Sequence, residues 1–465
     1  MAVRFSEAQL CDATGARVVR AGAQRSYEAV CTDTRALAKG CLFVALQGER
    51  FDAHDFLMDA VAGGAAAALV QAGRPLPALP RDFGVFEVPD TLAALGGLAR
   101  FHRRRFKLPV GAVGGSNGKT TTKEMLGAIL ATRGPALKTE GNLNNEVGVP
   151  LTLLRLDPSH VAAAIEVGMN HPGEMARLAS IVQPDAALIT IVQPEHLEGL
   201  GSLEGVARAE GELFAQLSGS AVAVVNLDDP MIPPQAQASR ARQLTFGRSE
   251  RADVRLVRVE PRGKQGIRAV IRTGGAEHAV DLAFLGDHNA LNATGAFALA
   301  MALGYRPDEC VRGLAQARPY ARRLNLVEAP GGITVLDDCY NANPASMAAA
   351  LQTLKALAQG GRAVAVLGDM LELGPGELEE HQKLGAAAAE EVDLLALFGP
   401  RSERGFQAAG RLAGKAHFVD VDPLVAWLKP QLREGDVVLV KGSRGMRLER
   451  VVAALTGQAP AGGGH

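Results

Sequence analysis

The chain has 465 residues, which is more than a single hydrophobic core usually organises and predicts about three domains. Hydrophobic residues make up 47% and charged residues 21%, and the formal net charge of −1 excludes a global field that would attract nucleic acid or an anionic membrane. The five cysteines are widely spaced without a C-x-x-C pair, which argues against a zinc or disulfide framework and favours a reducing compartment.

The N-terminal region, residues 1–107, is predicted to be a small α/β domain. Its start lacks the basic-then-apolar pattern of a signal peptide, and its most apolar run, residues 61–70, is too short to span a bilayer. We therefore expect a cytoplasmic protein that does not insert into membranes. Strand-like segments lie at residues 41–48 and 65–71, and the basic stretch 100–106 is interpreted as a solvent-exposed face of a linker helix.

The middle region, residues 108–318, and the C-terminal region, residues 319–465, alternate short apolar strands with helices, which is typical of parallel sheets. The predicted strands are residues 110–115, 161–168, 186–192, 221–229, 333–340, 361–370, 394–399, 416–421 and 436–443. The chain is therefore predicted to be a three-domain α/β protein, with a central doubly wound, mostly parallel sheet and a C-terminal Rossmann-like domain. Ligands of such sheets bind beyond the carboxyl ends of the strands, where most polar clusters of this chain fall.

The strongest local signal is VGAVGGSNGKTTTKEML at residues 110–126. Glycines let backbone N–H groups curl around phosphate oxygens, and the following helix adds the positive end of its dipole. The strict pattern G-x-x-x-x-G-K-[ST] fails, because Val113 stands where its first glycine would be. A generic glycine turn is the alternative, but the order of strand, glycines, Gly-Lys-Thr and helix favours a nucleoside triphosphate with Mg²⁺. The candidate residues are Gly115, Ser116, Asn117, Gly118, Lys119, Thr120 and Thr121.

Two strands of the middle region end in candidate metal ligands. Glu166 ends an apolar strand of the phosphate-loop sheet, where a carboxylate suits Mg²⁺, and Thr120 offers a hydroxyl oxygen. His196 follows the next strand and is the third candidate ligand. A solvent-facing strand end is the alternative for Glu166, and a structural role is the alternative for His196.

Asparagines form two further groups of candidates in the middle region. Asn142 and Asn145, in EGNLNNEVGVP, suit polar contacts to phosphate or substrate, but they also suit turns. Asn289 and Asn292 lie three residues apart on one face of a predicted helix. They could bind the edge of a nucleobase, and capping of the helix is the alternative.

The C-terminal region carries two polar clusters at predicted strand ends. VLDDCYNANPASM is too polar to be only a turn, and VLVKGSRGMRLERVV supplies cations suited to a carboxylate or phosphate. The candidate substrate-binding residues in these clusters are Tyr340, Asn341, Asn343, Lys441, Ser443 and Arg444. Because these residues belong to a different domain from the phosphate loop, an active site shared by two domains would close around its substrates.

Together these motifs resemble the Mur ligase family of peptidoglycan synthesis over nearly the whole chain. The resemblance rests on CTDTRALAKGCLFVALQGERFDAHDF, GGSNGKTTTKEM, TEGNLNNEVGVPLTLL, EVGMNHPGEM, EHLEGLGSLEGVARAEGE, HNALNATGAFA, LDDCYNANPASM, LGDMLELG and VLVKGSRGMRLE. Two of these motifs, YNANPASM and LGDMLELG, favour the member of the family that adds a dipeptide.

The resemblance implies a reaction and a set of ligands. ATP would phosphorylate a carboxylate of UDP-N-acetylmuramoyl-tripeptide, and the amine of D-alanyl-D-alanine would attack the acyl phosphate. It implies that the first domain holds UDP, that Asn289 and Asn292 face adenine, and that the third domain brings Arg323 and Asp338 to ATP. The UDP-binding residues that it implies are Asp33, Thr34, Arg35 and Gly48. We expect a monomer that does not bind nucleic acid.

The chain departs from the family pattern at three places. Gly114 stands where relatives commonly have Thr, and YARRLN stands where they commonly read Gly-Arg before the leucine, so that Arg323 is the residue carried over. Glu210 occupies the position of a lysine that is carbamylated in relatives and helps to hold a second Mg²⁺.

We hypothesise that Glu210 replaces the carbamylated lysine with a permanent carboxylate and joins Lys119, Glu166 and His196 in catalysis. Its side chain is shorter by about 4 Å, from bond lengths, and a bridging water could fill that gap. The alternative is an exposed helix residue without a role in metal binding. Other ligases that add a single amino acid, including folylpolyglutamate synthetases, and a non-catalytic nucleotide-binding module are the alternatives for the function.

Overall fold

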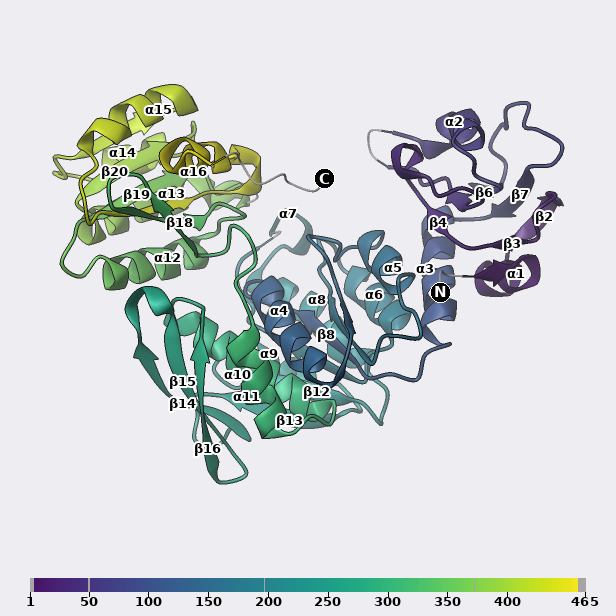
Figure 1. The fold of residues 1–465 in the computed structure, drawn as a ribbon, viewed down its shortest axis with the longest axis horizontal. Coiled ribbons are helices and arrows are strands. Elements are labelled where there is room, and N and C mark those ends of the chain that lie inside the picture. Colours follow the sequence, from purple (N-terminus) through teal and green to yellow (C-terminus); the bar gives the residue numbers. More distant parts are fainter. Residues whose placement is uncertain (1–3, 49–50, 196, 372, 459–465) are drawn as a thin grey trace.

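A computed structural model describes residues 4–48, 51–195, 197–371 and 373–458. Three main sheets follow one another along the chain and have five, nine and six strands. Figure 1 shows the N-terminal sheet and the C-terminal sheet on opposite sides of the central part. The predicted boundaries at 107/108 and 318/319 fall between these sheets, in the segments before β8 and before β17, and the boundaries themselves stay a prediction.

The N-terminal sheet has the order β2-β7-β6-β5-β4, in which only the β2–β7 pair is antiparallel. Its strands are β2 (Arg17–Arg20), β7 (Gly84–Val88), β6 (Ala67–Gln71), β5 (Leu42–Val44) and β4 (Val30–Cys31). A two-stranded sheet of β1 (Phe5–Ser6) and β3 (Ser26–Tyr27) and the helices α1 (Glu7–Thr14), α2 (Leu57–Ala62) and α3 (Thr91–Arg103) complete this part.

The central sheet has the order β16-β15-β14-β13-β12-β11-β8-β10-β9. Its strands are β8 (Val110–Gly114), β9 (Ala136–Lys138), β10 (Ala162–Glu166), β11 (Ala186–Ile189), β12 (Val222–Asn226), β13 (Arg242–Gly247), β14 (Val254–Pro261), β15 (Ile267–Thr273) and β16 (Ala276–Leu282). The strands from β9 to β14 run parallel, and β15 and β16 are added antiparallel at one edge.

Alternate residues of the central strands pack into two different cores. Ala112 and Ile165 face one core, and Val113 and Ala164 face the other, all with 0% exposure. Both faces of these strands are therefore covered, which explains why they are continuously apolar. The helices of this part are α4 (Lys119–Leu130), α5 (Gly148–Leu153), α6 (Glu174–Val182), α7 (Leu197–Leu200), α8 (Leu203–Ala215), α9 (Ile232–Gln237), α10 (Asp287–Ala302) and α11 (Pro307–Gln316).

The C-terminal sheet has the order β17-β18-β22-β19-β20-β21 and is parallel except for the β17–β18 pair. Its strands are β17 (Asn325–Ala329), β18 (Ile333–Asp338), β19 (Ala363–Gly368), β20 (Leu394–Phe398), β21 (Lys415–Phe418) and β22 (Val437–Lys441). Its helices are α12 (Pro344–Leu357), α13 (Glu377–Glu391), α14 (Glu403–Ala408), α15 (Val421–Leu428) and α16 (Glu449–Thr456). The predicted three-domain α/β fold is confirmed.

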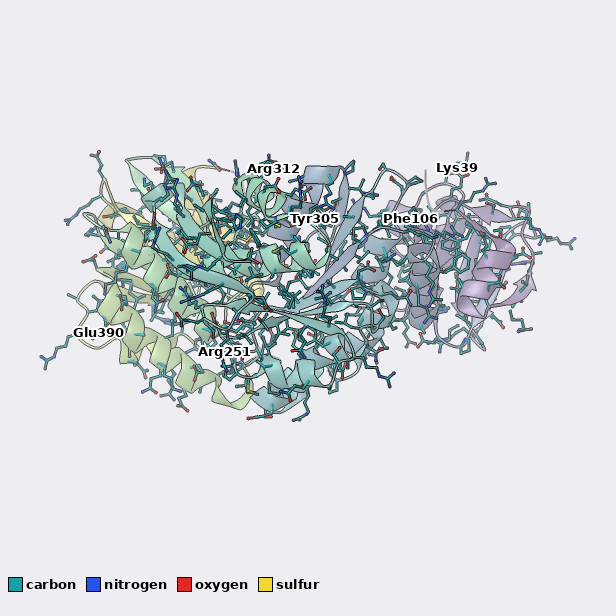
Figure 2. All side chains as sticks on the ribbon, turned by 90° about the horizontal axis from the view of Figure 1, so that it is seen from below. Lys39, Phe106, Arg251, Tyr305, Arg312 and Glu390 are labelled. Carbon is teal, nitrogen blue, oxygen red and sulfur yellow. The ribbon has the colours of Figure 1, made fainter. Side chains whose placement is uncertain are left out.

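The prediction that residues 100–106 form a solvent-exposed linker face holds for Arg100, Arg104 and Arg105, which are exposed, and is wrong for the residues between them. His102 and Arg103 are buried, and a ring nitrogen of His102 hydrogen-bonds the carbonyl oxygen of Leu156 at 2.8 Å. The Arg105 guanidinium stacks over the Phe5 ring, with 4.9 Å between its central carbon and the ring centroid. This basic segment therefore joins the first two parts, and Figure 2 shows Phe106 where the two parts of the ribbon meet.

None of the helices in the described ranges combines the length and the apolar character that crossing a membrane requires.

Candidate active site

Two glycines give the loop after β8 its shape. Gly115 and Gly118 have φ values of 113° and 81°, in the region that favours glycine. A Cβ on Gly115 would lie 2.2 Å from Thr190 Oγ1, and one on Gly118 would lie 2.5 Å from Asn292 Oδ1. The helix α4 begins directly afterwards at Lys119, with Thr120 and Thr121 in its first turn, so that the positive end of its dipole faces the loop. This geometry is that of an anion-binding loop.

Side chains of the loop fasten it to the segment after β11. The Ser116 hydroxyl donates to the carbonyl oxygen of Gln193 at 3.1 Å and accepts from the Gln193 N–H at 2.9 Å. The Asn117 amide donates to the Gln193 side chain, and the Thr190 hydroxyl donates to the carbonyl oxygen of Asn117. Ser116 and Asn117 therefore fix the shape of the loop, although both were predicted as contacts to the cofactor.

Lys119 lies among three carboxylates and remains positively charged. Its ammonium group donates to the carbonyl oxygens of Gly115 and Ser116, and Glu195 Oε1 lies 4.0 Å away. Burial lowers the pKa of Lys119, but the charges of Glu195, Glu210 and Glu166 outweigh that effect and raise the pKa above its usual value. The Lys119 ammonium group is thus placed at the loop, where it could contact the oxygens of a bound phosphate.

Glu166 and Thr120 come together, as the sequence predicts for two metal ligands. Glu166 is 2% exposed, and its Oε1 accepts from the Thr120 hydroxyl at 3.2 Å and from the Asn144 amide at 2.9 Å. Its Oε2 is buried without a hydrogen-bond partner among the described residues. A buried anionic oxygen beside a threonine hydroxyl fits Mg²⁺, which is commonly held by one or two carboxylates together with substrate phosphates.

The described side chains contain no cluster of three His, Cys, Asp or Glu residues that could hold a metal alone. His196, the third predicted ligand, lies outside the described residues.

Asn144 is a contact that the sequence analysis missed. Of the asparagines in this segment, Asn142 is exposed, and the Asn145 side chain accepts from the N–H groups of Val147 and Gly148 at the start of α5. Only Asn144 reaches Glu166. The sequence indicated the polar segment. The conformation of the turn within it decides that the side-chain amide of Asn144, and not that of Asn142 or Asn145, points to the Glu166 carboxylate.

Glu210 lies beneath the phosphate loop, and the alternative of an exposed helix residue is wrong. Glu210 is 1% exposed, and its Oε2 accepts from the Gly115 N–H at 2.8 Å. Its Oε1 is buried and unpartnered in the described part of the chain. The nearby Glu212 does not contact the loop in this way. Its carboxylate accepts from the N–H groups of Gly173 and Ala176 at the start of α6.

The environment of Glu210 predicts that the nucleotide-free protein loses stability as pH rises. Burial raises the pKa of Glu210 from 4.5 to about 7, so between these values the folded chain holds a proton that the unfolded chain has released. The stabilising contribution of protonated Glu210 to the free energy of unfolding should therefore decrease as pH rises from 4.5 to 7. Urea denaturation of wild type and Glu210→Gln at both pH values measures it. A stability difference between the two proteins that does not change with pH would contradict this expectation.

The asparagines predicted to face adenine contact each other and the loop. The Asn289 amide donates to the carbonyl oxygen of Leu285 at 2.8 Å and accepts from the Asn292 amide at 2.9 Å. Asn292 also faces Gly118 and lines a small pocket with Thr122 and Thr190. The pair therefore lies beside the phosphate loop, on the face of α10 that the sequence indicated.

The C-terminal part contributes two side chains to the phosphate loop. Arg323 donates to the Thr120 hydroxyl at 3.4 Å and stacks over the Tyr340 ring, 4.0 Å from its centroid. The Asn343 amide donates to Asn117 Oδ1 at 3.0 Å. The site is therefore assembled from two parts of the chain, as the sequence analysis expected.

The segment that carries Arg323 has an unusual backbone. Arg322 and Leu324, on either side of it, have φ values of 63° and 52°, although neither is glycine. The left-handed conformation costs such residues about 1–2 kcal/mol each. Arg322 is buried, and its guanidinium lies 3.7 Å from Glu449 on α16, which anchors this segment to the C-terminal part. Arg323 is thereby aimed at the phosphate loop.

Two other predicted residues of the C-terminal part, Lys441 and Ser443, face inward, whereas Arg444 does not. The Lys441 ammonium donates to Asp338 Oδ2 at 2.6 Å and to the carbonyl oxygen of Asn341 at 2.9 Å, with its side chain 3% exposed. Ser443 is also buried, and its hydroxyl accepts from the Leu371 N–H at 2.9 Å. Arg444 is exposed and extends towards the Tyr340 ring, 6.0 Å from its centroid.

The residues predicted to bind UDP lie in the N-terminal part, away from the phosphate loop. Arg35 is exposed and pairs with Asp33 at 2.7 Å, which lowers the pKa of Asp33 to about 2. Thr34 follows at the start of a short 3₁₀ helix, Thr34–Ala36. The N–H of Gly48 donates to the carbonyl oxygen of Phe51, whose side chain is 74% exposed.

Comparison with known proteins connects this site to one family. The family models described as "Mur ligase middle domain" and "Mur ligase, glutamate ligase domain" match residues 113–300 and 322–444. The UDP-N-acetylmuramoyl-tripeptide--D-alanyl-D-alanine ligase of Escherichia coli K12 is 42% identical, over 93% of this chain and 95% of that protein. The protein of the same name from Bacillus subtilis is 36% identical, over 93% and 94%.

Solved structures of proteins from the same family also match the fold of this chain. Crystal structure I of MurF from Acinetobacter baumannii matches 98% of this chain and 99% of its own, with a TM-score of 0.90 and 35% identity. The MurF ligase of Thermotoga maritima in complex with ADP matches 92% of this chain and 97% of its own, with a TM-score of 0.81 and 29% identity. The resemblance read from the motifs is confirmed: the chain belongs to the Mur ligase family, among the UDP-N-acetylmuramoyl-tripeptide--D-alanyl-D-alanine ligases.

Proposed function

We propose that the chain joins D-alanyl-D-alanine to UDP-N-acetylmuramoyl-tripeptide at the expense of ATP. The tripeptide carboxylate attacks the γ-phosphorus of ATP and gives an acyl phosphate and ADP. The dipeptide amine then attacks the acyl carbon, the amide bond forms, and phosphate leaves with the carboxylate oxygen. The names of the relatives and the ADP held by one of the solved structures support this substrate set.

The observation that carries the proposal is the meeting of three groups at one loop. Lys119 at the start of α4, Glu166 at the end of β10 and Arg323 from the C-terminal part all lie at the phosphate loop. The two cations, Lys119 and Arg323, would stabilise the negative charge that a phosphoryl group carries during transfer. Most of the catalytic effect would then come from positioning and charge.

We propose that Thr120 and Glu166 hold Mg²⁺ together with phosphate oxygens, because the unpartnered Glu166 Oε2 is a suitable ligand. The ion supplies positive charge to the phosphate oxygens. Glu210 stays a candidate for a second ion through its Oε1, since its Oε2 is occupied by Gly115. His196 stays a candidate in the same role.

The three parts of the chain divide the substrates between them in this proposal. The N-terminal part takes the UDP group at Asp33, Thr34, Arg35 and Gly48, and the central part takes ATP. The exposed Arg444, close to Tyr340, is suited to the carboxylate of the dipeptide, which arrives from the C-terminal part. We propose a monomer as the active unit, and we place it in the cytoplasm, where nucleotide-linked precursors and ATP are available.

Coupled release of ADP tests the proposal. With ATP and Mg²⁺, ADP should accumulate in step with amide product only when both UDP-N-acetylmuramoyl-tripeptide and D-alanyl-D-alanine are present. Single amino acids in place of the dipeptide separate this ligase from those that add one residue. Equal ADP release with folate and glutamate, or none with any acceptor pair, would contradict the proposal.

A further inference from the structure

The last residue of β8, Gly114, is a glycine for a reason other than its backbone. It lies in an extended strand, a conformation that every residue adopts, and its neighbours in the sheet, β10 and β11, are parallel strands in regular register. Glycine weakens the interior of a strand, because it has no side chain to pack and loses more conformational freedom on folding. Its presence here therefore indicates that space is needed beside the strand.

The carboxylate of Glu210 occupies that space. A Cβ on Gly114 would lie 2.9 Å from Glu210 Oε2, closer than real Cβ contacts tolerate. It would also lie 3.2 Å from Leu213 Cδ2 and 3.5 Å from Met175 Cε, the ends of two flexible side chains. Both of these side chains are buried in the core, but the carboxylate alone of the three is fixed by a hydrogen bond, which its Oε2 accepts from the Gly115 N–H at 2.8 Å.

We infer that Glu210 is a positioning residue of the phosphate loop. We infer further that Gly114, which has no side chain, leaves the room beside β8 that the Glu210 carboxylate needs. The hydrogen bond from Gly115 fixes the first turn of the loop, where the backbone has a φ of 113°. Without an acceptor at this point, the buried N–H of Gly115 is left unpaired, which favours other shapes of the loop. This role uses Oε2 and needs no metal, and it rests on the proposed nucleotide site.

Binding of ADP in the presence of EDTA isolates this role from any metal. Glu210→Gln keeps an oxygen acceptor of the same length, whereas Glu210→Ala removes it. Because both variants lose the charge, their comparison excludes the effect of charge. We expect the dissociation constant for ADP to be about tenfold higher in Glu210→Ala than in Glu210→Gln, as for one buried hydrogen bond. Gly114→Ala in the wild-type chain should displace the carboxylate and weaken ADP binding by a similar factor.

The double variant Gly114→Ala/Glu210→Ala tests whether the two residues act together. If Gly114 serves only to admit Glu210, then Gly114→Ala should change ADP binding less than about twofold once Glu210 is alanine. Equal affinities of Glu210→Gln and Glu210→Ala, or additive effects of Gly114→Ala and Glu210→Ala, would overturn the inference. If Gly114→Ala does not fold, as judged by its thermal transition, the Gln and Ala variants of Glu210 decide alone. Failure of the wild-type chain to bind ADP would instead contradict the proposed function.

Discussion

Replacing Lys119 with alanine is expected to lower the turnover number by about 10²- to 10³-fold, the usual effect of removing one group that stabilises transition-state charge. Lys119 keeps its charge because Glu195, Glu210 and Glu166 surround it. Its ammonium group is held at the loop by the carbonyl oxygens of Gly115 and Ser116. Phosphate oxygens bound in the loop would therefore meet a cation that is already in place.

The measurement is steady-state ADP release with saturating substrates. Lys119→Arg is the matched control, and we expect it to recover little of the activity, because a planar guanidinium does not fit the space of a compact ammonium group. The thermal transition of Lys119→Ala should stay close to that of wild type. Turnover within a fewfold of wild type would exclude Lys119 from the transfer of the phosphoryl group.

Replacing Lys441 with alanine is expected to lower the free energy of unfolding by about 3–5 kcal/mol, the cost of leaving one partner of a buried ion pair unpaired. The side chains of Lys441 and Asp338 are 3% and 11% exposed, and their charged atoms lie 2.6 Å apart. Lys441 ends β22 and Asp338 ends the neighbouring β18, so that the pair joins two adjacent strands. Asp338 also accepts from the Leu324 N–H at 3.2 Å.

Urea denaturation of the nucleotide-free protein measures this cost. The double variant Lys441→Met/Asp338→Asn removes both charges and keeps an acceptor for Leu324, and it should be more stable than Lys441→Ala. Lys383→Ala, which breaks exposed ion pairs on α13, is the control for a lysine at the surface and should change stability little. If Lys441→Ala is as stable as wild type, the ion pair does not hold the two strands together.

The strands at the centre of the fold could be predicted because both of their faces are buried. Residues of β8 are apolar throughout, as are those of β10 before its last residue, Glu166, and a short apolar run next to a glycine loop can be recognised without a structure. The antiparallel strands β15 and β16 were not predicted, although both show part of an alternating pattern. In β15 the half-buried Arg268 and Arg272 each stand between two buried residues, and in β16 the exposed Asp281 stands between the buried Val280 and Leu282. That alternation is the signal that could have found them.

Residue types alone could not show where the polar side chains point. The sequence identifies Lys441 as a cation at a strand end, but its pairing with Asp338 depends on two strands that are 103 residues apart in the chain and lie side by side in the sheet. Likewise, the buried Arg103 lies 3.4 Å from the carboxylate of Asp185, which is 82 residues further along the chain. Contacts over such separations are decided by the packing of whole elements.

Transfer of ¹⁸O from the tripeptide carboxylate to phosphate tests the central claim most directly. UDP-N-acetylmuramoyl-tripeptide labelled with ¹⁸O in that carboxylate is incubated with ATP, Mg²⁺, D-alanyl-D-alanine and the protein, and the released phosphate is examined by mass spectrometry. If the carboxylate is activated as an acyl phosphate, one oxygen of each phosphate comes from the carboxylate. Amide product formed together with unlabelled phosphate would contradict the proposed route.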